Sequence, residues 1–180
     1  MRFEPTAIAG AFFVELEAHE DDRGLFARIF CEEAFAQAGI ALRIAQANIS
    51  RNPKAGTLRG MHYQVPPHGE DKLVQCVRGR IFDVAVDLRP DAPSYRRSVS
   101  TELSADDTRL FFIPKGCAHG FLTLEDASDV FYFMGTAYIK DYGRGVRWDD
   151  PTFDIPWPES PRIISERDRS YSDYNAHEPK

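Results

Sequence analysis

The sequence predicts an all-β fold of the sandwich or barrel type, and two observations lead to this class. Most of the chain after residue 43 consists of short runs rich in Val, Ile, Leu and Phe, divided by Gly, Pro and Asp. Only one segment has the pattern of an amphipathic helix. Because a parallel βαβ sheet needs a helix between successive strands, this balance favours strands packed directly on strands.

The elements follow in order along the chain. The helix is expected from Cys31 to Gly39, since glycine suits the left-handed conformation that often ends a helix. A strand is expected at 43–50, with Gln46 and Asn48 on its polar face. Further strands are expected at 72–79, 80–88, 109–114, 120–124 and 130–134. Within 80–88, alternation places Phe82, Val84, Val86 and Leu88 on one face and Asp83 and Asp87 on the other.

The last part of the chain, from Trp148 onward, is rich in proline and aromatic residues. Side chains such as Phe153 and Trp157 are costly to leave in water. We therefore expect an ordered C-terminal arm packed over the core or a neighbour, with residues 175–180 frayed. Since no repeat or linker divides the sequence, one domain over residues 1–180 is expected.

Composition narrows the function classes. Hydrophobic residues make up 43% and charged residues 28% of the chain, an ordinary globular balance. The net charge of -6, with both signs scattered, argues against non-specific binding to nucleic acid, which needs a concentrated basic face. A phosphorylated ligand stays possible, because a few arginines in one cleft can outweigh the average.

The cysteines and the N-terminus indicate a cytoplasmic protein. The 3 cysteines are odd in number and have no CxxC spacing, which argues against a disulfide framework or a structural zinc site. The N-terminus has no basic region before an apolar run, so no signal peptide is expected. No uncharged apolar stretch approaches the roughly 18 residues that suggest a membrane span.

His62, in the segment GTLRGMHYQ, is the first candidate for chemistry. A histidine can act as a base, bind a metal or serve only the structure. Arg59 lies three residues before it, Lys72 follows in the next strand, and His119 lies in PKGCAHGF. The Pro and Gly residues around His119 predict a turn at the entry of a strand, with the ring at a rim or cavity.

A metal site is the first interpretation of these residues. His62, His68, Glu70 and His119 offer enough ligands for a cupin-like centre. However, metal-binding cupins typically begin with two histidines one residue apart, and Gln64 occupies that second place. Lys72 would also repel a cation. The sequence favours chemistry without a metal.

Proton abstraction next to a ketone is the competing interpretation. It requires a base, a cationic or hydrogen-bonding group at the enolate, and an acid. The candidates are His62 as base, Lys72 with Arg59 or His119 at the enolate, and Tyr132 as acid, on a strand face with Val130 and Met134. A carboxylate would fix the tautomer of His62, and both Asp168 and Asp83 are candidates.

Seven ordered segments together resemble the dTDP-4-dehydrorhamnose 3,5-epimerase family, from about residue 5 to residue 174. They are DDRGLF, QANIS, GTLRGMHYQ, KLVQCVRGRIFDVAVDLR, FFIPKGCAHGF, RWDDPTFDIPWP and ISERD. The resemblance implies a cupin-type jelly roll (double-stranded β-helix), a homodimer, and catalysis with neither metal nor cofactor. It implies epimerisation at carbons 3 and 5 of a dTDP-4-keto-6-deoxy-hexose, in dTDP-rhamnose and polysaccharide biosynthesis.

The resemblance also implies roles for individual residues. It assigns His62 as the base, Asp168 as its partner, Lys72 to the enolate and Tyr132 as the acid on the opposite face of the sugar. Arg59 and His119 match positions that line the sugar site. Positions that hold the nucleotide or its diphosphate match Arg23, Phe26, Gln46, Asn48 and Tyr138.

Three positions depart from the family pattern. Phe133 stands where a lysine commonly follows the catalytic tyrosine, Arg28 replaces a glutamate that helps hold the nucleotide, and Arg167 replaces a lysine. The first two point toward another base or sugar. The alternatives are therefore an epimerase that inverts one carbon of a CDP- or GDP-linked 4-keto sugar, a metal-dependent cupin oxygenase, and a non-catalytic sugar-binding cupin.

Overall fold

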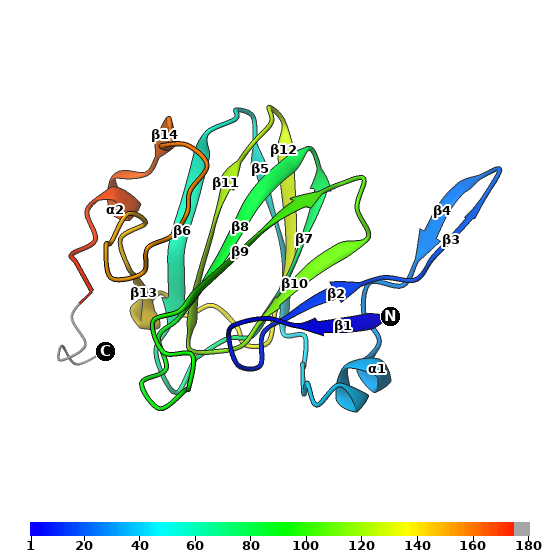
Figure 1. The fold of residues 1–180 in the computed structure, drawn as a ribbon, viewed down its shortest axis with the longest axis horizontal. Coiled ribbons are helices and arrows are strands. Elements are labelled where there is room, and N and C mark those ends of the chain that lie inside the picture. Colours follow the sequence, from blue (N-terminus) through cyan, green and yellow to red (C-terminus); the bar gives the residue numbers. More distant parts are fainter. Residues whose placement is uncertain (175–180) are drawn as a thin grey trace.

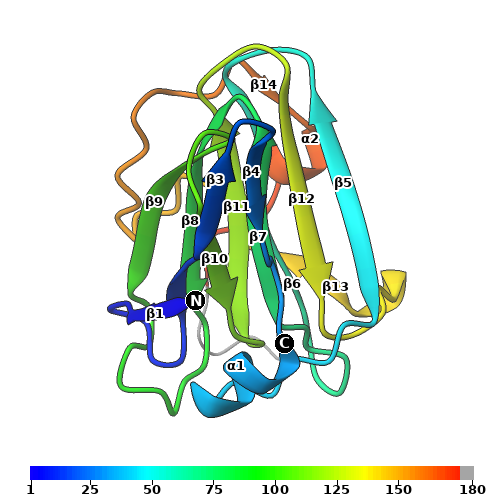
Figure 2. The ribbon, with the colours of Figure 1, turned by 90° about the vertical axis from the view of Figure 1, so that its right-hand side faces the viewer.

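In the computed structural model, which describes residues 1–174, two antiparallel sheets face each other. The six-stranded sheet contains, in spatial order, β1 (Arg2–Pro5), β2 (Phe12–Glu15), β10 (Arg109–Ile113), β7 (Lys72–Arg78), β12 (Ser128–Met134) and β5 (Gln46–Asn52). The second sheet contains β13 (Gly143–Gly145), β6 (Thr57–Gln64), β11 (Cys117–Thr123), β8 (Arg80–Asp87) and β9 (Ser98–Ser104), and β14 (Ile163–Ile164) pairs with β6 in parallel. Figures 1 and 2 show the two layers.

The chain crosses between the two sheets at almost every step from β5 to β13, and only β8 and β9 are successive strands of one sheet. This is the arrangement of a jelly roll, which closes strands into two facing sheets. The predicted all-β class and the cupin-type fold are confirmed. The segment 175–180, expected to be frayed, lies outside the described residues.

Four smaller elements complete the fold. They are the hairpin of β3 (Ala18–Asp21) and β4 (Gly24–Ala27), the helices α1 (Glu32–Gln37) and α2 (Glu166–Arg169), and the 3-10 helix η1 (Lys140–Tyr142). The hairpin projects from the body of the molecule (Figure 1). The helix predicted at 31–39 is confirmed as α1, and Gly39 after it has φ +77°, the left-handed conformation that favours glycine.

Three hydrophobic clusters hold the layers together. Between the sheets, Val74, Phe111 and Val130 belong to one buried cluster. On the outer side of the six-stranded sheet, α1 inserts Phe35, which is fully buried. On the outer side of the other sheet, Phe153 of the C-terminal arm packs into the third cluster. The arm is therefore ordered and covers the core, as its aromatic composition predicted.

The alternation predicted for β8 is correct, but both of its faces are buried. Val84 and Val86 face the C-terminal arm, while Ala85 faces the space between the sheets. Asp83 and Asp87 are consequently fully buried. Asp87 is paired with Arg89 at 2.8 Å, whereas Asp83 is hydrogen-bonded to His119 at 2.7 Å.

Two further features bear on sequence expectations. The three cysteines are all free, as their spacing predicted. Among residues 1–174 the structure has no helix long and apolar enough to cross a membrane.

Candidate active site

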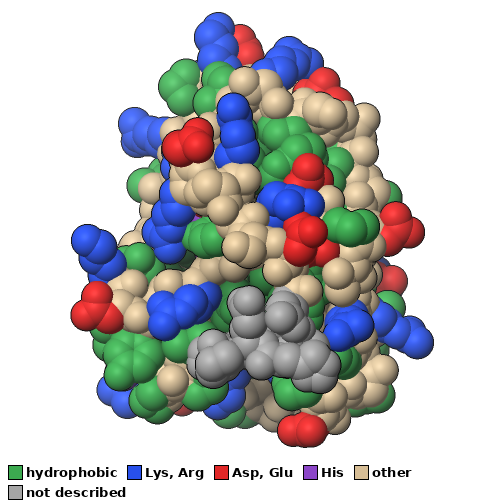
Figure 3. All heavy atoms as spheres, turned by 90° about the vertical axis from the view of Figure 1, so that its left-hand side faces the viewer, with side chains coloured by type: hydrophobic (Ala, Val, Ile, Leu, Met, Phe, Trp, Pro, Cys, Tyr) green, Lys and Arg blue, Asp and Glu red, His purple; other side chains and the backbone are tan. Residues whose placement is uncertain are grey.

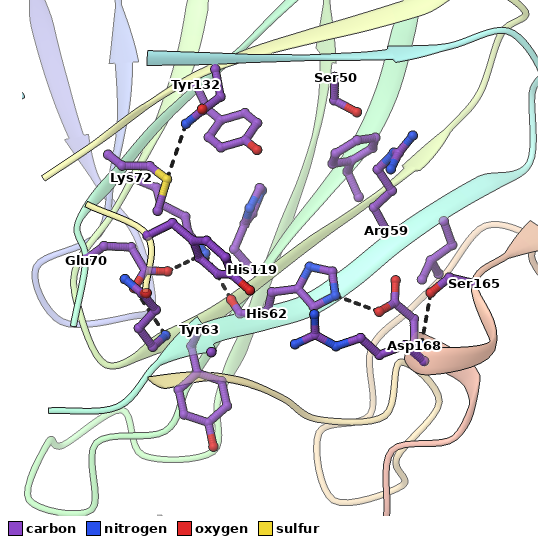
Figure 4. A pocket seen from close by; sticks show the side chains of 18 of the residues that line it. Ser50, Arg59, His62, Tyr63, Glu70, Lys72, His119, Tyr132, Ser165 and Asp168 are labelled. Atoms are coloured by element: carbon purple, nitrogen blue, oxygen red, sulfur yellow. Dashed lines mark hydrogen bonds and ion pairs between the residues drawn. The ribbon is translucent and has the colours of Figure 1, made fainter. Parts of the chain in front are cut away.

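A cavity of about 970 Å³ opens between the two sheets (Figure 4). Strands β5, β7 and β12 line one side, strands β6 and β11 line the other, and α2 closes one edge. Nine of the residues expected to catalyse the reaction or bind the substrate line it, namely Gln46, Asn48, Arg59, His62, Lys72, His119, Tyr132, Tyr138 and Asp168. Residues spread over more than a hundred positions of the sequence are thus brought together by the jelly roll.

His62 and Asp168 form a close pair at one side of the cavity. His62 Nε2 lies 2.7 Å from Asp168 Oδ1. Burial raises the pKa of the Asp168 carboxyl, but hydrogen bonds from His62 and from the amide of Gly60 outweigh it, so that the pKa is lowered. An ionised carboxylate only accepts hydrogen bonds, so Nε2–H donates and Nδ1 keeps its lone pair. Of the two carboxylates considered for His62, the structure pairs it with Asp168.

Local structure holds this pair in place. Asp168 lies on α2, whose first residues are capped by Ser165, because its hydroxyl accepts a hydrogen bond from the Asp168 amide at 3.1 Å. The other carboxylate oxygen accepts from the Gly60 amide at 3.3 Å. Gly60 has φ +143°, and a Cβ there would meet the Gly120 Cα of β11 at 2.5 Å. A glycine is therefore required where β6 and β11 approach closely beneath the pair.

Lys72 begins β7 and is almost entirely buried. Its Nζ lies 3.0 Å from Glu70 Oε1 and donates to the carbonyl oxygen of His62 at 2.9 Å. The ammonium is thereby held beside the same strand that carries the histidine base candidate. Glu70, considered from the sequence only as a metal ligand, is instead the partner of Lys72.

Asp83 pairs with His119 and not with His62. His119 Nε2 lies 2.7 Å from Asp83 Oδ1, and both side chains are buried. The second oxygen of Asp83 is buried and has no hydrogen-bond partner among the described residues. The turn predicted at the entry of this strand is confirmed: Lys115 and Gly116 form it directly before β11, and His119 lines the cavity, with His62 of β6 as its cross-strand neighbour. The cavity lining therefore includes a second histidine, His119, whose carboxylate partner does not itself line the cavity.

Tyr132 faces the cavity from the sheet opposite His62 (Figure 4). Its neighbours on β12 alternate as predicted, since Val130 packs between the sheets and Phe133 packs on the outer side. Burial raises the pKa of the Tyr132 phenol, although the nearby Arg59 lowers it in part. The phenol therefore keeps its proton at neutral pH.

Arg23 and Phe26 lie away from this cavity. Both belong to the β3–β4 hairpin, where Arg23 is paired with Asp21 at 2.5 Å and the Phe26 side chain is 69% exposed. Neither lines the cavity of its own chain. The expectation that they hold the nucleotide is not met within one chain.

The match to a family model decides which family this is. The model for dTDP-4-dehydrorhamnose 3,5-epimerase matches residues 5–176. This chain belongs to that family. The resemblance seen in its sequence motifs is confirmed.

Relatives extend over nearly the whole chain. The dTDP-4-dehydrorhamnose 3,5-epimerase of Methanothermobacter thermautotrophicus is 43% identical over 174 residues, covering 94% of this chain and 92% of the relative. The crystal structure of the Bacillus anthracis enzyme, with TDP and PPi bound, superposes with a TM-score of 0.92 at 37% identity, covering 96% and 99% of the two chains. A dTDP-6-deoxy-D-glucose-3,5-epimerase from Legionella pneumophila, in complex with dTDP-4-keto-L-rhamnose, has a TM-score of 0.87 at 35% identity, covering 93% and 89%.

The positions that depart from the family pattern lie in different places. Phe133 packs on the outer side of the six-stranded sheet, against Phe131, and does not line the cavity of its own chain. Arg167 does line it, beside Asp168, and its pKa is raised by contact with the Tyr138 hydroxyl. Arg28 lies in the loop after the hairpin. None of the three replaces a member of the pairs described above.

The cavity of this family member is cationic although the chain as a whole is acidic. Its lining includes five cationic side chains, Arg51, Arg59, Arg144, Arg167 and Lys72, but only two carboxylates, Glu70 and Asp168, each already paired. On the face that carries α2 and β14, Figure 3 shows Lys and Arg side chains along one side. The arginines expected to outweigh the average charge are thus gathered in one cleft.

Proposed function

We propose that this protein epimerises carbons 3 and 5 of dTDP-4-keto-6-deoxyglucose, giving dTDP-4-keto-rhamnose, and that it does so in the cytoplasm to supply dTDP-rhamnose for polysaccharides. One observation supports this above all: His62, backed by a carboxylate, and Tyr132 face each other across one cavity with the Lys72 ammonium beside them. Inversion of a carbon needs a base on one side and an acid on the other. Family membership supports the same substrate class.

In the proposed reaction, Nδ1 of His62 removes the proton from carbon 5 or carbon 3, each of which is acidified by the neighbouring ketone. The electron pair of the broken C–H bond moves to the ketone oxygen, which becomes an enolate. The charge on this oxygen appears only as the reaction proceeds, so its hydrogen bond from Lys72 lowers the barrier more than it strengthens binding of the substrate.

Tyr132 then completes the inversion. As the ketone reforms, the phenol gives its proton to the same carbon from the opposite face. The tyrosinate and the imidazolium return to their starting states by proton exchange with water. The Asp168 carboxylate stabilises the imidazolium formed in the first step.

The cationic lining supports a substrate with a diphosphate. Arg59 projects into the cavity, and its Nε is held by Asn52 at 2.8 Å. Gln46 and Tyr138 lie together at the same cavity, joined by a hydrogen bond of 2.8 Å. Arginine recognises phosphate oxygens through two parallel hydrogen bonds, which makes this lining suitable for the nucleotide half of the substrate.

We further propose that the active protein is a homodimer, with the hairpin of each chain reaching the cavity of its partner. Arg23 and Phe26 match family positions that hold the nucleotide, yet they lie outside the cavity of their own chain. The hairpin exposes Leu25 and Phe26, and strands β5 and β7 of the six-stranded sheet expose Ile49 and Val77. A second copy would cover these apolar side chains and would bring the two hairpin residues to a cavity.

The reaction is tested by incubation with dTDP-4-keto-6-deoxyglucose in deuterated water, followed by NMR. Deuterium at both carbons 3 and 5, with formation of the 4-keto-rhamnose product, is the expected result. Deuterium at one carbon alone would replace the proposal with a single-site epimerase. Absence of exchange with the dTDP, CDP and GDP forms would reject the proposed function.

The dimer is tested by coexpressing two inactive variants, Arg23→Glu and His62→Asn. In a mixed dimer that shares its hairpins, one cavity carries both changes and the other carries neither. Random pairing then restores about a quarter of the wild-type activity. If the hairpin serves its own cavity, no combination of the two chains is active.

A further inference from the structure

We propose that Glu70 is a positioning residue that orients Lys72 and acts on the reaction only through it. This inference rests on the proposed function, in which the Lys72 ammonium stabilises the enolate. Nothing in the family resemblance assigns a role to Glu70.

The hydrogen bonds of the ammonium show how Lys72 is held. An ammonium has three N–H donors. One is directed to Glu70 Oε1 at 3.0 Å, and a second is donated to the His62 carbonyl oxygen at 2.9 Å. Both side chains line the cavity, and because these are the two partners of Nζ among residues 1–174, the third donor is available to a ligand there. Two fixed partners thus determine where the third N–H points.

Glu70 is itself held at both ends of its carboxylate. Its Oε2 accepts a hydrogen bond from the Gln64 backbone amide at 3.1 Å, while Oε1 contacts Lys72. The side chains of Glu70 and Lys72 are only 4% and 8% exposed. The carboxylate therefore connects the ammonium of β7 to the backbone of β6, two residues after the base. Such a link fixes the distance between His62, the proposed base, and the Lys72 ammonium, which stabilises the enolate.

The surroundings make this link rigid. The Gln64 side chain donates to the His68 carbonyl at 2.9 Å and accepts from the Ile139 amide at 2.6 Å. The loop that carries Glu70 is thereby tied to the loop after β12. A buried ammonium is costly unless an anion compensates it, so Glu70 also keeps the charge of Lys72 in the cavity.

The test separates positioning from a general loss of structure by a double-mutant cycle. The four proteins are the wild type, Glu70→Ala, Lys72→Met and the double variant, each assayed for kcat and KM with dTDP-4-keto-6-deoxyglucose. Glu70→Ala is expected to lower kcat by about 10- to 100-fold and to change KM by less than about threefold, since Glu70 does not bind substrate. In the Lys72→Met background the same change is expected to lower kcat by less than about twofold.

Two further variants serve as controls. Glu70→Gln keeps one acceptor oxygen where the native contacts use two, so its kcat is expected to lie between those of wild type and Glu70→Ala. Glu102→Ala removes a carboxylate of similar size from an exposed ion pair with Arg80 and is expected to leave kcat unchanged.

Three results would overturn the inference. Glu70→Ala could lower kcat by the same factor in the wild-type and Lys72→Met backgrounds, it could change KM alone, or it could keep the wild-type kcat. A crystal structure of Glu70→Ala gives a readout that needs no substrate, because Lys72 Nζ is expected to leave the His62 carbonyl. An unmoved Nζ contradicts the inference whatever the reaction is. A wild-type protein without turnover would instead reject the proposed function, and the position of Nζ would still decide the role of Glu70.

Discussion

Two histidines line the cavity and each is hydrogen-bonded to a carboxylate, but the two pairs differ in their exposure and in the part of the chain that supplies the carboxylate. In both, a ring Nε2 lies 2.7 Å from a carboxylate oxygen. The His62 side chain is 40% exposed, and its partner Asp168 comes from the C-terminal arm. The His119 side chain is 9% exposed, and its partner Asp83 lies on the neighbouring strand of the same sheet.

Because of this difference in exposure, one pair is placed to take up a proton from a substrate, whereas the other joins two neighbouring strands. His62 has a free ring edge, and its exposure allows the proton it takes to exchange with water. His119 is enclosed, and the second oxygen of Asp83 has no hydrogen-bond partner among the described residues. Removal of one partner from a buried hydrogen-bonded pair leaves the other polar group unsatisfied, which is destabilising. We therefore expect substitutions at the two pairs to separate activity from stability.

The largest expected effect is that of His62→Asn. The variant keeps a polar side chain but has no base, so solvent exchange at carbons 3 and 5 is expected to fall by about 10³-fold or more. Because the His62 side chain is partly exposed, the unfolding midpoint should move little. Deuterium incorporation by NMR and a thermal melt check the two parts. Exchange at the wild-type rate would remove His62 from the mechanism.

Tyr132→Phe is expected to have the next largest effect. It removes the acid but leaves the base, so product formation should fall by about 100-fold while initial exchange at the first carbon falls much less. The measurement compares the rate of deuterium incorporation with the rate of product formation in one sample. An equal loss of both would exclude Tyr132 as the acid that acts on the opposite face.

Much of this architecture could be predicted from the sequence because side-chain alternation is a local property. Alternation placed Tyr132 with Val130 on one face of β12, and an amphipathic helical pattern that ends at Gly39 located α1. The strands β1, β3 and β4 were not predicted, since they are short and mostly exposed, and such strands lack an apolar period.

The pairing of groups far apart in the chain could not be predicted in this way. From the residues alone, Asp83 and Asp168 were equal candidates for His62, because the choice depends on the register of β8 against β11 and on the path of the C-terminal arm. The resemblance to a family supplied the correct partner. The Glu70 and Lys72 pair did carry a local signal, since residues two apart in extended chain share a face.

Breaking the pair of His119 and Asp83 should lower the rate of catalysis less than His62→Asn or Tyr132→Phe does, but should lower stability more. Asp83→Ala leaves the buried His119 without its hydrogen-bond partner, so the free energy of unfolding is expected to fall by about 2 kcal/mol. The rate of epimerisation of the folded protein is expected to fall by about tenfold, since His119 lines the cavity but keeps its place in β11. Urea unfolding and kcat measured on the same preparation give both values. A stable but inactive variant would make the second pair catalytic.

The smallest expected effect is on the free energy of unfolding, to which Asp168 makes a contribution that depends on pH. Burial raises its pKa, but the hydrogen bonds from His62 and Gly60 lower it further, to below the ordinary value of 3.8. The folded protein therefore binds this proton less tightly than the unfolded chain, and the stabilisation is present above about pH 4 and lost as the pH falls through the folded pKa.

The difference in unfolding free energy between wild type and Asp168→Asn is expected to be about 1 kcal/mol at pH 7 and to shrink toward pH 3. Asp126→Asn is a surface control, because Asp126 also has a lowered pKa, owing first to its hydrogen bond from the Ala55 amide and then to Lys54, but is fully exposed. High salt should screen the exposed pair with Lys54 and leave the hydrogen bond of the buried Asp168 carboxylate with His62 nearly unchanged. If the Asp168 difference shows the salt dependence of the control, the carboxylate is solvated and does not orient the base.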